Sequence, residues 1–117
     1  AYFESADLTQ ANFYGAKMRS ANFAGAKLRQ THFTNADLSA ANLFGATLIR
    51  TGLDQTVLDS VVVDNYNWLA QLPTGSQDSI RGLNHVLSNY RVDSVQTVMR
   101  VQFMLLRKGK TTFKSPD

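Results

Sequence analysis

Residues 1–65 repeat at an interval of five, and this period constrains the fold more than any other feature of the sequence. In the stretch ANFYGAKMRSANFAGAKLRQ, residues 11–30, the triplets ANF, AKM, ANF and AKL begin five residues apart. An α-helix repeats about every 3.6 residues and a β-strand about every 2.0. A period of five fits neither, so we expect a repeat architecture rather than ordinary helices or strands.

Thirteen five-residue units follow one another in one register and end at Asn65. The first position is alanine in nine units, and the third is always phenylalanine, leucine, methionine or valine. We expect the third-position side chains to fill the interior and the small first-position side chains to lie at corners. Glycine recurs at the fifth position, where it suits a tight turn with positive φ.

This pattern resembles the pentapeptide-repeat family, whose units read A-(D/N)-L-x-x, over 65 of the 117 residues. The resemblance implies a mainly β fold: a right-handed quadrilateral parallel β-helix of about three coils, with four units in each coil. A C-terminal α/β cap with at least one helix would follow. The predicted core consists of Phe3, Leu8, Phe13, Met18, Phe23, Leu28, Phe33, Leu38, Leu43, Leu48, Leu53 and Leu58.

A coil of four units predicts that residues twenty apart stack on one another. Phenylalanines would then stack on two opposite sides of the coil, and aliphatic residues on the other two. The same rule places Asp7 under Lys27 and Lys17 under Asp37. Neighbouring charges along each ladder would therefore attract, which favours this register.

The repeat is absent from residues 66–117, and we expect this segment to cap the last coil. Open ends of repeat arrays expose apolar side chains and unpaired strand edges, so they need covering. Trp68, Leu69 and Leu72 are the predicted covering residues. The sequence thus divides into a repeat domain, 1–65, and a capping segment, 66–117.

A helix is expected near residues 77–90, with Ser76 or Asp78 as its N-cap. Its predicted apolar stripe consists of Ile80, Leu83, Leu87 and Tyr90. Residues 95–107 alternate over a long stretch, which favours a strand. A helix is the alternative there, because Asp93 or Ser94 could cap it and Arg107-Lys108-Gly109 resembles a helix end. The tail beyond residue 109 is polar and expected to be loose.

Ala1 opens a complete repeat unit with no capping segment before it. An uncovered first coil would expose Phe3, Leu8 and a row of strand donors and acceptors. We therefore expect the chain to continue before Ala1, or another molecule to stack on this end.

No arrangement of residues predicts catalysis, a cofactor or a metal site. His32 holds an outward position of a repeat unit, and His85 lies away from the apolar stripe of the expected helix, so both are expected at the surface. Cysteine is absent, and no phosphate-binding loop or hydrolase motif is present. We therefore predict that the chain is not an enzyme.

The positive charges give no reason to expect nucleic acid as a partner. The net charge is only +3, and the basic residues of the repeats divide between two opposite sides. One side carries Lys17 and Arg19, and the other carries Lys27, Arg29 and Arg50. Solvated faces with acidic neighbours are the simpler interpretation.

Three apolar residues at outward positions, Tyr14, Phe44 and Ile49, are the candidate interaction surface. Exposed apolar side chains that cluster can mark an interface. The alternative is that the C-terminal helix folds back over Phe44 and Ile49. Trp68 is interpreted as a cap residue rather than a binding residue.

The family resemblance implies a non-enzymatic protein–protein interaction or structural scaffold module, within a longer chain or an assembly and with a protein partner. The Trp-containing segment is similar to tails that follow such repeats in cyanobacterial members. The alternative is a DNA mimic resembling the members that bind DNA gyrase. Those are long, acidic, rod-like dimers, whereas this chain is basic and has about three coils.

The sequence leaves the compartment open between the cytoplasm and, for a photosynthetic source, the thylakoid lumen. No apolar run approaches the roughly 20 residues that a membrane span needs, and we therefore expect a soluble protein.

Overall fold

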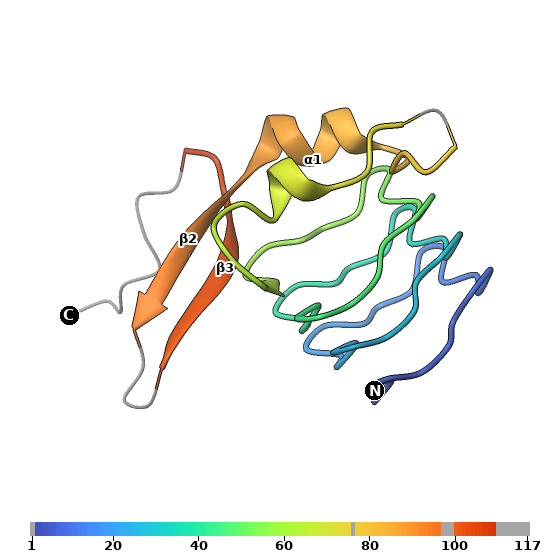
Figure 1. Ribbon diagram of the computed structural model, residues 1–117, viewed down its shortest axis with the longest axis horizontal. Helices are drawn as coiled ribbons and strands as arrows, with labels where there is room; N and C mark the ends of the chain where they lie inside the picture. The colour runs from blue at the N-terminus through green and yellow to red at the C-terminus, as the bar shows by residue number, and fades with distance from the viewer. Residues whose placement is uncertain (1, 76, 97–99, 110–117) are drawn as a thin grey trace.

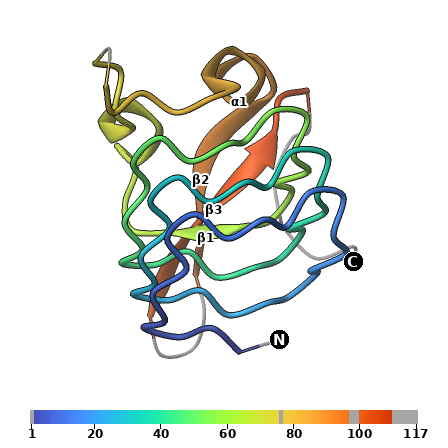
Figure 2. The same ribbon diagram turned by 90° about the vertical axis from the view of Figure 1, so that its right-hand side faces the viewer.

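The computed structural model describes residues 2–75, 77–96 and 100–109 of the chain. Residues 2–65, called the repeat region below, wind into coils that lie on one another (Figures 1 and 2). Parallel bridges join residues twenty apart, including Asp7 with Lys27 and Lys17 with Asp37. Four five-residue units therefore make one coil, and the predicted stacking interval of twenty residues is confirmed.

Where the second position of a unit is Asn or Asp, a hydrogen bond from the backbone to that side chain supports the turn at the end of the unit. The N–H of Ala24 donates to Oδ1 of Asn22, and the N–H of Phe44 donates to Oδ1 of Asn42, both over 2.9 Å. The fifth residue of every unit from Ser5 to Ser60 then has a positive φ. The Asn or Asp at the second position thus shapes the turn, and glycine at the fifth removes the cost of a Cβ there.

The phenylalanines of the interior stack between coils as predicted. The ring centroids of Phe3 and Phe23 lie 5.2 Å apart with a 10° angle between planes, and those of Phe13 and Phe33 lie 5.5 Å apart at 10°. The third-position residues of the first coil are half-buried. The following ones are buried, namely Phe23, Leu28, Phe33, Leu38, Leu43, Leu48, Leu53 and Leu58.

Three threonines replace alanine at buried first positions without leaving an unpaired hydroxyl. Oγ1 of Thr31 donates to the C=O of Leu8, and Thr51 and Thr56 donate in the same way to carbonyls 23 residues before them, over 2.7–2.9 Å. All three side chains are fully buried. A buried hydroxyl is tolerated when it is hydrogen-bonded, which accounts for these exceptions to the alanine pattern.

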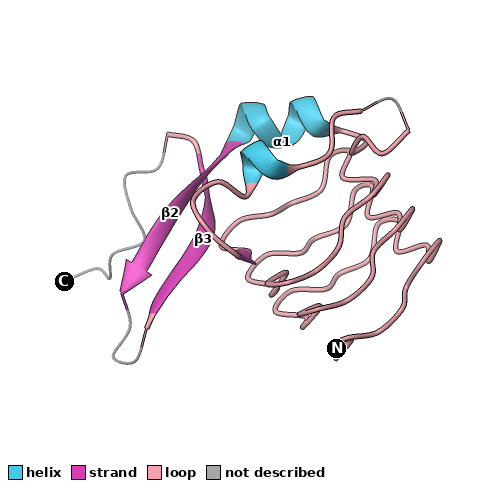
Figure 3. Cartoon of the chain, in the orientation of Figure 1, coloured by secondary structure: helices cyan, strands magenta, loops and turns pink. Residues whose placement is uncertain are grey.

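The C-terminal part closes the end of the stack that lies away from the N-terminus (Figure 1). Its described residues contain one α-helix and two strands, and these strands join β1 of the last repeat unit in a sheet of the order β1-β3-β2 (Figure 3). The elements are β1 (Val62–Val63), a short 3-10 helix (Leu69–Gln71), α1 (Leu83–Asn89), β2 (Tyr90–Gln96) and β3 (Val101–Arg107).

Strand β1 belongs to the last repeat unit, yet it pairs antiparallel with β3. The repeat region and the C-terminal segment therefore share one sheet, and the division at Asn65 stays a prediction. Trp68 and Leu72 are buried in the core, and Leu69 packs against it. These three residues were the ones expected to cover the last coil.

Helix α1 is shorter than the helix expected over residues 77–90. It begins after Gly82, whose φ is 79° and which provides no side-chain cap, so the N-cap prediction for Asp78 is wrong; that for Ser76 lies outside the described residues. The residues before Gly82 are held by the coil instead: the N–H of Leu53 donates to the C=O of Arg81, whose own N–H donates to the C=O of Thr51. This pairing prevents an earlier helix start.

The apolar stripe of the helix is also corrected. Its buried residue is Val86, whereas Leu87 is 40% exposed. Tyr90 is buried, but it begins β2 and pairs with Arg107 of β3. The chain becomes extended at Tyr90 because β3 offers a strand edge for pairing. The helix therefore ends at Asn89, and Tyr90 is not part of its apolar stripe.

The second half of the strand predicted near 95–107 is confirmed, because it forms β3. The first half is different, because residues 90–96 form the separate antiparallel strand β2. Residues 97–99 and the tail predicted to be loose, 110–117, lie outside the described residues.

We expect the substitution Ala40→Gly to stabilise the protein. Ala40 has a φ of 63°, and an L-residue in this left-handed region costs roughly 1–2 kcal/mol. Glycine removes that cost but adds about 0.4–1 kcal/mol of chain entropy to the unfolded state. The free energy of unfolding in denaturant should therefore rise, by about 0.5–1 kcal/mol.

Ala24→Gly is the matched control, because Ala24 holds the fourth position of its unit and is not among the residues with positive φ. It should lower the stability by about 0.5–1 kcal/mol. An equal decrease in the free energy of unfolding for both variants would contradict the role assigned to the fifth position.

Candidate interaction surface

Phe44 forms part of an apolar groove between the repeat region and the strands β1 and β3. Its side chain is 55% exposed, and that of Val101 across the groove is 46% exposed. The groove has a volume of about 280 Å³. It is lined by Ala24, Asn42, Phe44, Val62, Val63, Asp64, Arg100, Val101, Gln102 and Phe103.

Both walls of the groove are held by contacts within the chain. On the repeat side, the N–H of Gly45, which follows Phe44, donates to the carboxylate of Asp64 over 3.0 Å. On the other side, the ring of Phe103 meets Tyr66 edge-on at 4.8 Å, and the Tyr66 hydroxyl donates to Oγ of Ser94 over 2.7 Å. The shape of the groove is therefore held by contacts within the chain itself.

The structure does not bring Tyr14, Phe44 and Ile49 together. Tyr14 is 65% exposed, and its hydroxyl accepts a hydrogen bond from Nδ2 of Asn35 over 3.0 Å. Ile49 is half-buried, and neither residue lines the groove. Their role in binding stays a prediction.

The alternative, in which the helix covers Phe44, is wrong, because the side chain is largely exposed and its groove lies against β3. Sequence reasoning missed Val101 and Phe103 as neighbours of Phe44. The alternation of apolar residues in 95–107 placed both on one face of a strand. No pattern in the sequence indicated which side of the coil that strand would reach.

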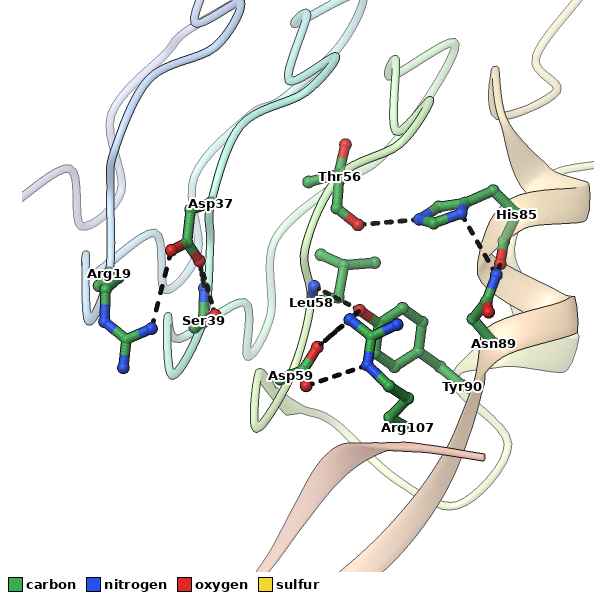
Figure 4. A network of polar contacts seen from close by, with 10 residues as sticks. All are labelled: Arg19, Asp37, Ser39, Thr56, Leu58, Asp59, His85, Asn89, Tyr90 and Arg107. Atoms are coloured by element: carbon green, nitrogen blue, oxygen red, sulfur yellow. Dashed lines mark hydrogen bonds and ion pairs between the residues drawn. The ribbon is translucent and has the colours of Figure 1, made fainter. Parts of the chain in front are cut away.

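The cap uses side chains to replace a missing coil segment on one side of the stack (Figure 4). One coil earlier, the N–H of Leu38 donates to the C=O of Val57, and the N–H of Val57 donates to the C=O of Ala36. In the last coil, the N–H of Leu58 donates instead to the Tyr90 hydroxyl over 2.9 Å. The C=O of Thr56 meets Nε2 of His85, also over 2.9 Å.

The partners of His85 assign its tautomer. The C=O of Thr56 can only accept, so Nε2 carries the hydrogen, and Nδ1 accepts from Nδ2 of Asn89 over 3.3 Å. His85, which was expected at the surface, is half-buried and bonds to the last coil. Thr56 lies 29 residues away in the sequence, and no local pattern indicates the contact. His32 is half-buried in the repeat region.

Asp59, Tyr90 and Arg107 form a polar cluster beside this replaced segment (Figure 4). The Tyr90 hydroxyl donates to Oδ1 of Asp59 over 2.7 Å, and Nη2 of Arg107 donates to the same oxygen over 2.7 Å. Nε of Arg107 donates to Oδ2 over 3.2 Å, which makes the ion pair bidentate. The guanidinium also lies over the Tyr90 ring, 5.1 Å from its centroid.

The cluster shifts the acidities of its members. Burial raises the pKa of Asp59, but the hydrogen bonds from Arg107 and Tyr90 outweigh it, so this pKa lies below its ordinary value. Burial raises the pKa of Tyr90 to about 12, and the neighbouring Asp59 carboxylate acts in the same direction. The hydrogen bond to Asp59 raises the pKa of Arg107. Each group is stabilised in the form that joins the cap to the last coil.

A second, open depression brings together Asp54, Ser79 and His85, residue types that occur in hydrolase triads. It has a volume of about 550 Å³. Both ring nitrogens of His85 already contact Thr56 and Asn89, so the imidazole is not positioned to take a proton from Ser79. Within residues 2–75, 77–96 and 100–109, no group of three or more His, Asp or Glu side chains is placed to hold a metal ion.

The first part of the repeat region matches a known family model. A family model described as pentapeptide repeats (8 copies) matches residues 1–35. This match agrees with the family resemblance inferred from the five-residue period.

Solved structures of pentapeptide-repeat proteins overlap the chain in part. One from the cyanobacterium Cyanothece is 30% identical and is matched over 55% of this chain and 40% of its own length, with a TM-score of 0.39. HetL from the cyanobacterium Nostoc, a protein involved in regulating heterocyst differentiation, is 22% identical over 55% of this chain and 39% of its own, with a TM-score of 0.33.

A third, from the thylakoid lumen of Arabidopsis thaliana, is 24% identical over 65% of this chain and 52% of its own, with a TM-score of 0.33. The chain thus spans about half or less of the length of these proteins. A comparison with curated proteins gave no match. Among the helices of the described residues, none has the length and apolar character needed to cross a bilayer.

We expect Asp59→Asn to destabilise the protein at neutral pH and much less in acid. The folded-state pKa of Asp59 is lowered, so its contribution is complete above the unfolded value of about 3.9 and is lost as the pH falls through the folded value. Because the pair is partly exposed and screened, the loss should be about 1 kcal/mol. Denaturant unfolding from pH 7 to pH 2 measures it.

Asp78→Asn serves as the control, because it removes an exposed carboxylate outside the cluster. Its stability should follow that of the wild type at every pH. A deficit of Asp59→Asn that stays constant down to pH 2 would show that the carboxylate charge is not what matters.

Proposed function

We propose that the chain is a non-enzymatic protein–protein interaction or structural scaffold module, and that the groove beside Phe44 is its docking site. In this proposal the pentapeptide repeats form a right-handed quadrilateral parallel β-helix that holds the groove in place. The observation that carries the proposal is an aromatic side chain, 55% exposed, in the wall of an apolar groove whose two sides are fixed by internal contacts.

The groove suits an apolar anchor from a protein better than a small-molecule ligand. Its volume of about 280 Å³ is just under the roughly 300–1,000 Å³ of small-molecule sites. Interfaces between proteins are often centred on one or two large side chains that fill such a pocket. Phe44, Val101 and Phe103 supply apolar surface for one such anchor.

Rigidity supports the same proposal. The backbone N–H groups of Phe44 and Gly45 are held by hydrogen bonds to the side chains of Asn42 and Asp64. The coil that carries Phe44 is also paired to the coil on either side of it. Binding to a preformed surface loses little conformational entropy. A preformed surface of this kind suits a scaffold.

The depression that contains Ser79 and His85 does not favour a hydrolase over this proposal. His85 is the only histidine near Ser79, and its ring serves the cap. The net charge of +3 speaks against an acidic DNA mimic, the alternative considered from the sequence.

The proposal is tested by affinity capture from a lysate of the source organism with wild type, Phe44→Asp and Tyr14→Asp, each checked for folding by circular dichroism. Tyr14 is the matched control because it is equally prominent at the surface but outside the groove. A specific partner should be captured by wild type and Tyr14→Asp. Its recovery with Phe44→Asp should fall at least about tenfold, since burying a phenylalanine is worth about 1.5–3 kcal/mol.

Equal recovery with Phe44→Asp would exclude the groove as the docking site. An equal loss with Tyr14→Asp would show that capture depends on general apolar exposure. No specific partner for the wild type would contradict the interaction module itself.

A further inference from the structure

Strand β2 is one of the two outer strands of the sheet, and the pairing of its neighbour β3 shows which backbone groups of β2 face outward. The order of strands is β1-β3-β2. The N–H of Leu105 donates to the C=O of Val61, and its C=O accepts from the N–H of Ser60, so the backbone of Leu105 faces away from β2. Val92 lies opposite Leu105. By the alternation of antiparallel ladders, the N–H and C=O of Val92 face the outer edge.

The residues two positions before and after Val92 confirm this orientation. The N–H of Tyr90 donates to the C=O of Val86 in helix α1, and the N–H of Ser94 donates to Oδ1 of Asp93 over 2.8 Å. Both groups are therefore directed away from β3. Among the hydrogen bonds outside the strand ladders that the described residues form, none uses the N–H or C=O of Val92. Its edge can take a further strand.

The two charged residues beside Val92 would attract their counterparts in a second, antiparallel β2 strand. Arg91 and Asp93 flank Val92, and their side chains lie on the same face of the strand, with Nη1 and Oδ2 3.5 Å apart. In an antiparallel pair of two β2 strands centred on Val92, Arg91 lies opposite Asp93 of the second copy, and the reverse pair forms by symmetry. These positions are non-hydrogen-bonded ones, where facing side chains approach most closely.

We propose that β2 pairs antiparallel with β2 of a second copy of this chain, with Val92 on the two-fold axis. The two Val92 residues exchange both backbone hydrogen bonds. The N–H of Ser94 leaves Asp93 and donates to the C=O of Tyr90 of the second copy. Two cross-strand ion pairs join the same edge, and the two sheets become one continuous sheet.

The charges also select this register against its neighbours. A two-fold axis through Arg91 would place two guanidinium groups opposite each other, and an axis through Asp93 would place two carboxylates opposite each other. Like charges in facing positions are destabilising. Val92 is therefore the centre that gives opposite charges at both flanking positions.

The pairing is independent of the groove beside Phe44. The groove lies on the side of β1 and β3, and β1 and β2 form the two opposite edges of the sheet. A dimer through β2 leaves both grooves open, so the dimer can exist whether or not the groove binds a partner.

The test compares wild type, Arg91→Asp, Asp93→Arg and the double variant by sedimentation velocity, with circular dichroism as a check of folding. Small interfaces are weak, so the series should extend to about 1 mM protein. The wild type should dimerise. Each single variant sets like charges opposite each other and should self-associate at least about tenfold more weakly, and the double variant should recover.

A mixture of the two single variants gives the sharpest outcome. Arg91→Asp carries only acidic groups at this edge and Asp93→Arg only basic ones, so the two should associate with each other although neither self-associates. A wild type that stays monomeric at about 1 mM would overturn the proposal and leave the edge to a strand of another protein. Failure of both the double variant and the mixture to recover association would overturn it as well.

Discussion

Hydrogen bonds between successive coils are the interaction on which the rest of the structure depends. From Phe3 to Leu43, the N–H of the third-position residue donates to the next coil, as from Phe23 to Asn42. From Lys27 to Val62, the N–H of the second-position residue donates to the preceding coil, as from Asn42 to Ala21. This two-way pairing fixes the position of every outward side chain. It therefore sets the place of Phe44 on its side of the stack and the shape of the groove beside it.

The last coil has no further repeat to complete this pairing, and the cap supplies the missing partners by several different means. Arg81 offers backbone groups on one side, Leu105 offers them on another, and Tyr90 and His85 offer side-chain atoms between them. Asp59 and Arg107 then hold the hairpin in position. The hairpin that closes the core is thus also the element that forms one wall of the groove and leaves β2 at an edge.

The repeat region could be predicted closely from the sequence, because its period determines both the stacking interval and the inward residues. Phe3 over Phe23 and Asp7 beside Lys27 follow directly from a coil of twenty. The cap could not be predicted in the same way. The start of α1 depends on the pairing of Arg81 with Leu53, and the role of His85 depends on Thr56. These contacts join distant residues and leave no periodic signal. The groove was foreseen only through the exposure of Phe44.

The side chains of Tyr90 and His85, which replace backbone partners of the last coil, limit the insertions that the repeat region can accept. The cap fits only one side of the last coil, because these side chains reach Leu58 and Thr56 and no other edge groups. An insertion of one five-residue unit before the cap would turn the end of the stack by a quarter of a coil and present the wrong side. An insertion of twenty residues restores the same side one level higher. Lengthening that retains this cap should therefore proceed by whole coils.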